Sequence, residues 1–278
     1  MRWYRANGRH HLPWRLTRDA YAVLVSEIML QQTQVDRVLP YYHAWLERWP
    51  DFASLASAPA AEVIRAWRGL GYNRRAANLQ RLAAAVVEHD RGELPTGVRE
   101  LLRLPGVGEY TASAVRCFAR EERVSVADTN IARVAARSAL GAASQRDVSA
   151  RTLANTLDSL LPVRNARDHN LALMDLGALV CTARAPDCSG CPLNAACVWR
   201  AAGHPAATTA ARPTPRFETT ARYARGRIVD ALREAPATTR ELTAMLPEPH
   251  HERVPGYLAA LQRDGLIQQA GGLWQLPR

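Results

Sequence analysis

The chain has 278 residues, a formal net charge of +10 and a sequence pI of about 10.0. All 36 basic residues are arginine, and lysine is absent. This length and charge indicate two or three domains and an anionic partner such as nucleic acid. No apolar run approaches the roughly 20 residues of a membrane span, and Met1 is followed by Arg-Trp-Tyr-Arg rather than by an apolar signal core. We therefore expect a cytoplasmic protein.

Apolar residues at three- and four-residue spacing predict a body that is helical almost throughout. Short breakers that contain Pro or Gly separate the helices, and strand patterns are few before residue 260. The sequence therefore predicts an all-α body, with helices over residues 20–34, 40–48, 60–68, 74–89, 98–104, 109–120, 129–139, 147–160 and 168–181.

Glu27 is the only charged residue in the first of these helices, and Val23 and Leu24 lie one turn away. A carboxylate among apolar neighbours is partly desolvated, which raises its pKa and favours the protonated form that can act as an acid. The spacing alone leaves open a Glu that reaches solvent. The string Ser-Glu-Ile-Met-Leu-Gln-Gln-Thr-Gln over residues 26–34 closely resembles the catalytic helix of MutY-type DNA glycosylases.

Other positions match this family as well. Gln31, Gln32, Gly71 and Tyr72 stand where the family fills the gap left by an extruded base and touches the base opposite. Trp14 falls where the family builds part of its base pocket, although a core Trp is the plain alternative. Without the resemblance, Gln31 and Gln32 would be a polar helix end, and Gly71 and Tyr72 would be part of a turn.

The segment Leu-Pro-Gly-Val-Gly-Glu-Tyr over residues 104–110 joins two predicted helices. Pro ends the first helix, and Gly106 and Gly108 permit positive φ and a close backbone approach. The second helix then offers free N–H groups to a phosphate. The segment resembles the helix-hairpin-helix element of DNA glycosylases, which holds duplex backbone without reading sequence. Tyr110 matches a family position beside the sugar and the leaving base.

Asp128 lies where an extended segment leads into a helix, and N-capping is its plain interpretation. The position also matches the Asp that faces the sugar of the flipped nucleotide in the superfamily. Both roles are compatible, because a capped carboxylate is an immobile electrostatic partner. Leu171 is a departure: the family has Gln or Glu at this position, hydrogen-bonded to adenine.

Four cysteines follow with the spacing C-x6-C-x2-C-x5-C, which lets four thiolates meet at one metal centre. A reducing cytoplasm disfavours disulfides, and the spacing leaves an iron–sulfur cluster and structural zinc open. The spacing also resembles the cluster loop of the endonuclease III and MutY family. That resemblance implies a 4Fe-4S cluster that places Arg184 against phosphates, with the ligands Cys181, Cys188, Cys191 and Cys197.

Residues 201–216 hold few apolar anchors and predict a linker. Three further helices, around residues 219–234, 238–246 and 252–264, precede a β-hairpin signalled by Gly271 and Gly272. The pattern suggests a winged-helix module, and a small helical cap packed on the body is an equal alternative. The Nudix-like domain usual in the family is expected to be absent, because residues 217–278 are too few for it.

The resemblance implies the helix-hairpin-helix glycosylase fold. A cluster domain would comprise residues 1–16 with 128–200, and a six-helix barrel with the hairpin would comprise residues 17–127. The implied activity is base-excision repair: Glu27 protonates a flipped base and Asp128 stabilises the sugar cation, with adenine opposite guanine or 8-oxoguanine as the substrate. Strand cleavage is not expected, because a lysine amine is lacking.

Two alternatives remain. One is a glycosylase of the same scaffold that removes thymine or uracil opposite guanine, or an oxidised pyrimidine, which Leu171 allows. The other is a DNA-binding protein with an inactive glycosylase body. The presence of both Glu27 and Asp128 argues against the second. In either case the expected partner is double-stranded DNA with a mismatched or damaged base, bound by a monomer at the nucleoid of a bacterial cell.

Overall fold

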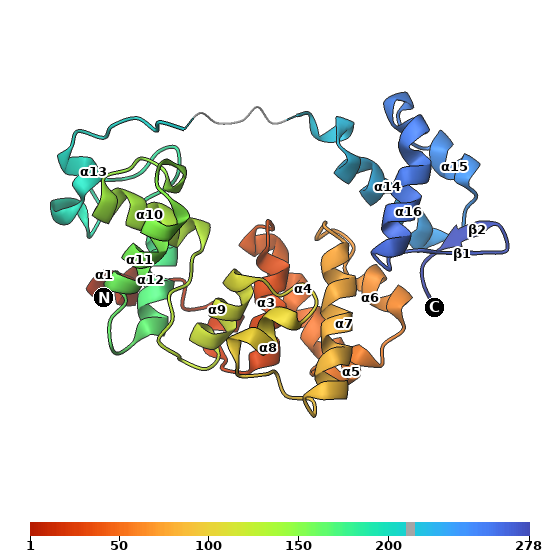
Figure 1. Cartoon of the computed structure of the whole chain (residues 1–278), viewed down its shortest axis with the longest axis horizontal. Helices are drawn as coiled ribbons and strands as arrows, with labels where there is room; N and C mark the ends of the chain where they lie inside the picture. Colours follow the sequence, from red (N-terminus) through yellow and green to blue (C-terminus); the bar gives the residue numbers. More distant parts are fainter. Residues whose placement is uncertain (210–214) are drawn as a thin grey trace. The chain divides into compact units, whose positions relative to one another are not determined.

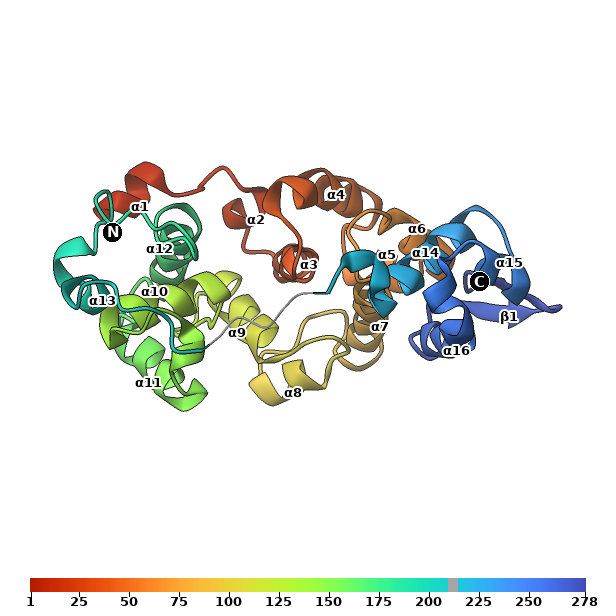
Figure 2. The same cartoon turned by 90° about the horizontal axis from the view of Figure 1, so that it is seen from above.

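The computed structural model describes residues 1–209 and 215–278, and these are mostly helical (Figures 1 and 2). Two compact units divide the chain: Met1–Val23 with Gly108–Arg212, and Leu24–Val107 with Pro213–Arg278. The predicted all-α body is confirmed. Part of the predicted linker, residues 210–214, lies outside the described residues. In the described part of the chain, no helix is long and apolar enough to cross a membrane.

The unit that holds residues 24–107 contains most of the predicted barrel. Phe52–Ala56 packs against Arg74–His89, and the rings of Trp45, Trp49 and Trp67 meet edge to face with centroids 4.7 and 5.3 Å apart. Such aromatic contacts stabilise a helical core beyond their buried area. The helices of this part are α3 (Ala20–Leu30, which crosses the unit boundary), α4 (Val35–Arg48), α5 (Phe52–Ala56), α6 (Ala60–Ala66), α7 (Arg74–His89) and α8 (Val98–Arg103).

The other unit joins the N-terminal segment to the second half of the body. Asp175 is fully buried and accepts hydrogen bonds from Nε of Arg9 at 2.7 Å and Nη2 of Arg15 at 2.7 Å. This contact holds residues 1–16 beside residues 166–179. The helices are α1 (Arg2–Asn7), α2 (Pro13–Leu16), α9 (Glu109–Phe118), α10 (Thr129–Leu140), α11 (Ala150–Leu160), α12 (Ala166–Leu179) and α13 (Val198–Ala201).

Helix α10 is the centre of this unit and packs on α11, α12 and α13. Its contact with α12 is close at Gly177, where an added Cβ would lie 2.6 Å from Cβ of Asn130. Helix α9 also packs on α12, so the unit takes in residues 108–127. The predicted domain boundaries placed these residues in the barrel, and those boundaries stay a prediction.

Residues 217–278 form three helices and a β-hairpin: α14 (Ala221–Glu234), α15 (Thr239–Ala244), α16 (Val254–Arg263), β1 (Gln268–Ala270) and β2 (Leu273–Gln275). The strands are antiparallel, and Gly271 and Gly272 both have positive φ, as a tight hairpin turn requires. Ala237 adds a bridge to Trp274. The winged-helix-like pattern is therefore confirmed.

This module is also packed on the body, as the alternative interpretation proposed. Ile64 of α6 and Ala77 of α7 share a buried cluster with Ile228 and Leu258 of the module. Both views show α14 and α16 beside β1 in one group with α6 nearby (Figures 1 and 2). The two interpretations of residues 217–278 thus describe one arrangement.

Several helix bounds differ from the predicted ones. The helix predicted over residues 20–34 ends at Leu30, because Gln32 adopts φ of 56° and leaves the helix. The helix predicted from residue 40 begins at Val35, with Pro40 inside it. Because Pro is disfavoured in helix interiors, Pro40 led to a predicted helix start five residues too late. Four short helices, α1, α2, α5 and α13, were not predicted.

Candidate active site and cluster loop

Glu27 lies on α3 and is 5% exposed. Val23 and Leu24, its neighbours one turn before, are 0% and 1% exposed, and Ile28 is 3% exposed. The carboxylate of Asp19 caps the helix by accepting a hydrogen bond from the N–H of Ala22 at 2.6 Å. The buried, apolar environment predicted for Glu27 is therefore present.

Arg75 connects the end of α3 to the turn at residues 69–72. Its buried guanidinium donates to the carbonyls of Ile28, Met29 and Gln31 at 2.7 to 2.9 Å, and to those of Leu70 and Gly71 at 2.9 and 3.0 Å. Burial lowers the pKa of Arg75 to about 10, so the group stays charged at neutral pH. These bonds satisfy carbonyls that the helix end leaves unpaired.

The sequence did not indicate Arg75 as a site residue, because its acceptors are carbonyls of distant segments and carry no side-chain pattern. The sequence likewise did not indicate the backbone conformation of the two segments that Arg75 joins. Gln32 and Tyr72 have φ of 56° and 47°, a region that costs non-glycine residues free energy. The hydroxyl of Tyr72 donates to Oε1 of Gln32. The structure therefore brings these two predicted residues together.

The predicted hairpin adopts the backbone that its glycines permit. Gly106 has φ of +81°, and an added Cβ would lie 3.0 Å from Cβ of Asn78. Gly108 precedes α9 and an added Cβ would meet nothing within 4 Å. Gly108 and Glu109 are exposed before and at the first turn of α9, and a helix N-terminus can bind an anion such as a phosphate. Tyr110 lies in this turn and is half-buried.

Asp128 is the N-cap of α10, as predicted. Its Oδ1 accepts hydrogen bonds from the N–H of Asn130 at 2.6 Å and of Ile131 at 3.3 Å. The segment before it is held by Asn170 of α12, which donates to the carbonyl of Val124 at 3.1 Å and accepts from the N–H of Val126 at 3.2 Å. The position of Asp128 is therefore held by its bonds to the helix that follows it and by the bonds of Asn170 to the segment that precedes it.

Asn170 was also missed by sequence reasoning. It is 2% exposed, and its neighbour Leu171, the position that departs from the family, is 4% exposed. Trp14 of α2 is 7% exposed. Trp14, Tyr110, Asp128 and Leu171 belong to one unit, whereas Glu27, Gln31, Gln32, Gly71, Tyr72 and Gly106 belong to the other.

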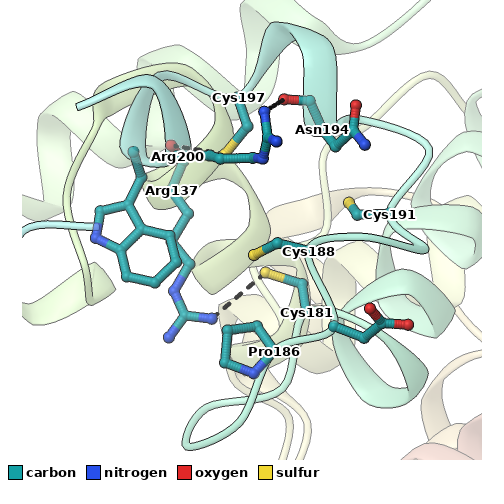
Figure 3. A pocket seen from close by; sticks show the side chains of 10 residues that line it. Arg137, Cys181, Pro186, Cys188, Cys191, Asn194, Cys197 and Arg200 are labelled. Carbon is teal, nitrogen blue, oxygen red and sulfur yellow. Dashed lines mark hydrogen bonds between the residues drawn. The ribbon is translucent and has the colours of Figure 1, made fainter. Parts of the chain in front are cut away.

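The four cysteines of the loop line one small pocket (Figure 3). The sulfurs of Cys181 and Cys188 point into it beside Arg137, with Cys191 and Cys197 on the other sides. Among the described residues, no group of three or more His, Cys, Asp or Glu side chains converges closely enough to hold a single metal ion. The pocket offers four cysteine sulfurs, and such a set is the ligand set of an iron–sulfur cluster and also of a structural zinc site.

Arg137 and Arg200 line this pocket together with Asp187 and the four cysteines. Burial, followed by the neighbouring cysteines, raises the pKa of Cys188 above its ordinary value, and burial likewise raises the pKa of Cys191. Nη1 of Arg137 lies 3.5 Å from Sγ of Cys181, and its guanidinium stacks 4.6 Å from the ring of Trp199. Four thiolates here need a cationic centre for their charge, which the iron of a cluster supplies. The residues therefore fit the predicted group.

Arg137 and Arg133 hold the loop to α10. Arg137 donates to the carbonyls of Thr182 at 2.7 Å and Ala183 at 3.0 Å, and Arg133 donates to the carbonyl of Cys181 at 2.8 Å. Arg184, next in the loop, is exposed. Its guanidinium is therefore available to solvent and to an anionic ligand.

Known proteins resemble this chain in sequence. Residues 25–157 match the family described as HhH-GPD superfamily base excision DNA repair protein. The chain is 45% identical over 272 residues to the adenine DNA glycosylase of Mycolicibacterium smegmatis, which covers 96% of this chain and 90% of the relative. It is 43% identical over 205 residues to the adenine DNA glycosylase of Homo sapiens, with 70% of this chain and 37% of the relative covered.

Solved structures agree on the fold. A thermostable thymine-DNA glycosylase matches with a TM-score of 0.65 and 32% identity, covering 70% of this chain and 91% of that one. A non-covalent endonuclease III–DNA complex matches with a TM-score of 0.62 and 24% identity, covering 73% of this chain and 92% of that one, and shows the fold alone.

The fold and the relatives described above define the class of this protein: it is a DNA glycosylase, an enzyme of base excision repair. With the relatives described above, the chain belongs to the HhH-GPD superfamily of base excision DNA repair proteins, in its MutY-type branch.

Proposed function

We propose that this protein removes adenine opposite guanine or 8-oxoguanine from duplex DNA by hydrolysing its N-glycosidic bond. The observation that carries the proposal is 45% identity to an adenine DNA glycosylase over 96% of the chain. The buried Glu27, within the string that resembles the family's catalytic helix, supports it. A mispaired base is easiest to extrude, because unstacking costs only a few kcal/mol there.

Two carboxylates divide the chemistry, as in other glycoside cleavage. Glu27 donates a proton to the purine, so that the base leaves as a neutral molecule, and then helps water to attack. Asp128 stabilises the positive charge that develops on the sugar. Because its N-cap bonds already hold it in place, little reorganisation is needed when that charge appears. Tyr110 has a supporting role beside the sugar.

Binding of the duplex is assigned to backbone and arginine groups. The amides at Gly106, Gly108 and the start of α9 hold phosphates, and Arg184 adds a charge from the loop. Cys181, Cys188, Cys191 and Cys197 would hold a 4Fe-4S cluster. When bound, this group supplies structural cross-linking of the loop and no step of the hydrolysis.

A second candidate function is a glycosylase of the same fold that excises a different base. The 32% identity to a thymine-DNA glycosylase and the apolar Leu171 favour thymine opposite guanine as its substrate. A pocket without a hydrogen-bond partner for adenine discriminates less strongly against other bases, because each good pairing is worth about 1–3 kcal/mol.

The test is a panel of labelled duplexes that carry one adenine opposite 8-oxoguanine, adenine opposite guanine, thymine opposite guanine or uracil opposite guanine. Base release is measured in single turnover after alkali treatment. We expect both adenine duplexes to react fastest.

Glu27→Gln should abolish base release and keep duplex binding, because it preserves the shape of the side chain and removes the proton donor. Faster release of thymine would support the second candidate, and full activity of Glu27→Gln would remove Glu27 from the chemistry.

A further inference from the structure

Arg222 of the C-terminal module reaches the two residues that the family resemblance assigns to the strand opposite the excised base. Its Nη1 donates to the hydroxyl of Tyr72, and that hydroxyl in turn donates to Oε1 of Gln32. The three side chains form one hydrogen-bonded chain from α14 to the end of α3. The family strings that assign roles to Gln32 and Tyr72 end before α14, so they assign no role to Arg222.

Stacking supports the same arrangement. The guanidinium carbon of Arg222 lies 4.8 Å from the ring centroid of Tyr72 and 4.8 Å from that of Phe217. The guanidinium of Arg75 lies 5.6 Å from the Tyr72 ring. Cation–π contacts of this length are attractive. The ring of Tyr72 therefore contacts two arginines, one from the body and one from the module.

The conformation that these contacts hold is not one that the residues adopt freely. Gln32 and Tyr72 both have left-handed backbone angles, which non-glycine residues keep only where the surroundings impose them. Arg75 fixes the backbone through carbonyls on both segments. Arg222 acts on the side chains instead, because it bonds the hydroxyl of Tyr72.

The module is docked firmly enough to place Arg222. Arg233, on the same helix, is 6% exposed, and its guanidinium donates to the carbonyl of Ile64 at 3.0 Å and to Oδ1 of Asn73 at 2.8 Å. Arg68 of the body pairs with Glu234. Together with the shared apolar cluster, these contacts make α14 part of the same unit as residues 24–107.

We propose that Arg222 is a positioning residue that holds Tyr72 and Gln32 in the conformation that meets the strand opposite the excised base. Through it the C-terminal module contributes to the choice of the opposite base. This inference rests on the proposed function for the roles of Tyr72 and Gln32. Its test must therefore not depend on which base the enzyme removes.

The test is binding of the full chain to duplexes with a tetrahydrofuran abasic analogue opposite 8-oxoguanine, guanine or cytosine, measured by fluorescence anisotropy. No base is present to be excised, so a failed adenine assay leaves this readout intact. We expect the wild-type protein to prefer guanine or 8-oxoguanine over cytosine. Arg222→Ala should reduce that preference about threefold to tenfold, the scale of one cation–π contact with a hydrogen bond.

Four further variants, one of them a control, test the inference more closely. Tyr72→Phe should reproduce the loss, and the double variant Arg222→Ala with Tyr72→Phe should lose no more than either alone, because both remove one linkage. Arg222→Lys, which keeps the charge, should recover part of the preference. Arg227→Ala is the matched control, an exposed arginine on the same helix, and should leave the preference unchanged. Thermal melting confirms that each variant is folded.

Two results would overturn the inference. An equal loss of affinity for all three duplexes, with a salt dependence of binding reduced by about one phosphate contact, would make Arg222 a backbone contact. A wild-type protein without preference among the three opposite bases, or an unchanged preference in folded Arg222→Ala, would remove the module from opposite-strand selection.

Discussion

The side-chain oxygen of Asn170 accepts a hydrogen bond from the N–H of Val126 at 3.2 Å, and this bond joins α12 to the segment that ends in Asp128. Its amide donates to the carbonyl of Val124 on the same segment. The position of the carboxylate is thus determined by a residue on another helix, in addition to its own N-cap bonds.

Replacing Asn170 should therefore slow base release. Asn170→Ala leaves two backbone groups without partners and lets Asp128 shift, and small misplacements in an active site lower kcat by about tenfold to a hundredfold. Stability should fall by about 1–3 kcal/mol. Asn155→Ala, at an exposed site of α11, serves as the control. The measurement is the single-turnover rate of base release at saturating enzyme. An unchanged rate in Asn170→Ala would show that Asp128 is held in place without Asn170.

Leu171→Gln should increase the selectivity for adenine. A buried amide facing the base would add a hydrogen-bond pairing, worth about tenfold or more in discrimination. Leu171→Ala removes the side chain without adding a partner and should not increase selectivity. The measurement is the ratio of release rates for adenine and thymine opposite guanine. A lower ratio in Leu171→Gln would mean that residue 171 does not face the base.

Protein purified without oxygen should contain about four iron atoms per chain and show broad visible absorbance. Cys191→Ser should lower the iron content and loosen the loop. Cys117→Ser is the matched control, because Cys117 is buried on α9 and does not line the cavity. Stoichiometric zinc without iron, or equal iron in both variants, would contradict the assignment.

The enzyme should release a base without cutting the strand efficiently. Strand cleavage by related enzymes uses a lysine amine that forms a Schiff base with the sugar, and this chain has no lysine. Arginine cannot replace it, because its guanidinium stays protonated. Reacted duplexes should break only after alkali or heat. Efficient borohydride trapping of a protein–DNA adduct would show that another amine acts.

The ion pair of Asp175 should make stability depend on acid pH. Burial alone would raise the pKa of Asp175, but the hydrogen bonds and charges of Arg15 and Arg9 outweigh it and lower the pKa below its ordinary value of 3.8. Because the folded-state pKa is lowered, the stabilisation is present above about pH 4 and is lost as the pH falls through the folded-state value.

Asp175→Asn should therefore destabilise the protein by about 3–5 kcal/mol near neutral pH, because it leaves a buried arginine without its charge partner. The difference from the wild type should shrink as the pH falls below about 4. Urea unfolding at several pH values measures it. Asp168→Asn, at a half-exposed carboxylate 3.8 Å from Arg167, should cost little. A pH-independent difference would indicate that packing, not charge, is lost.

Sequence patterns predicted the helices and the site chemistry where the signal is local. Helical spacing around Glu27 left its burial open, and the resemblance of residues 26–34 to a family string favoured burial. The Pro-Gly-Val-Gly segment indicated the hairpin, and cysteine spacing indicated one shared site. Each depends on residues within a few turns of one another. Helix ends were less predictable: the turn at Gln31 and Gln32 carries no breaker residue, and Pro40 concealed the start of α4.

The sequence by itself determined the class of enzyme, because compact strings of it resemble those of a known family. Those same strings predicted the two carboxylates and the four cysteine ligands. Only the tertiary structure decided which side chains hold the predicted site residues and their backbone segments in place. Arg75, Asn170 and Arg222 act on carbonyls, amides and a hydroxyl from segments far away in the chain. Such partners leave no periodic pattern, since a backbone group can be reached from any residue that the fold brings close.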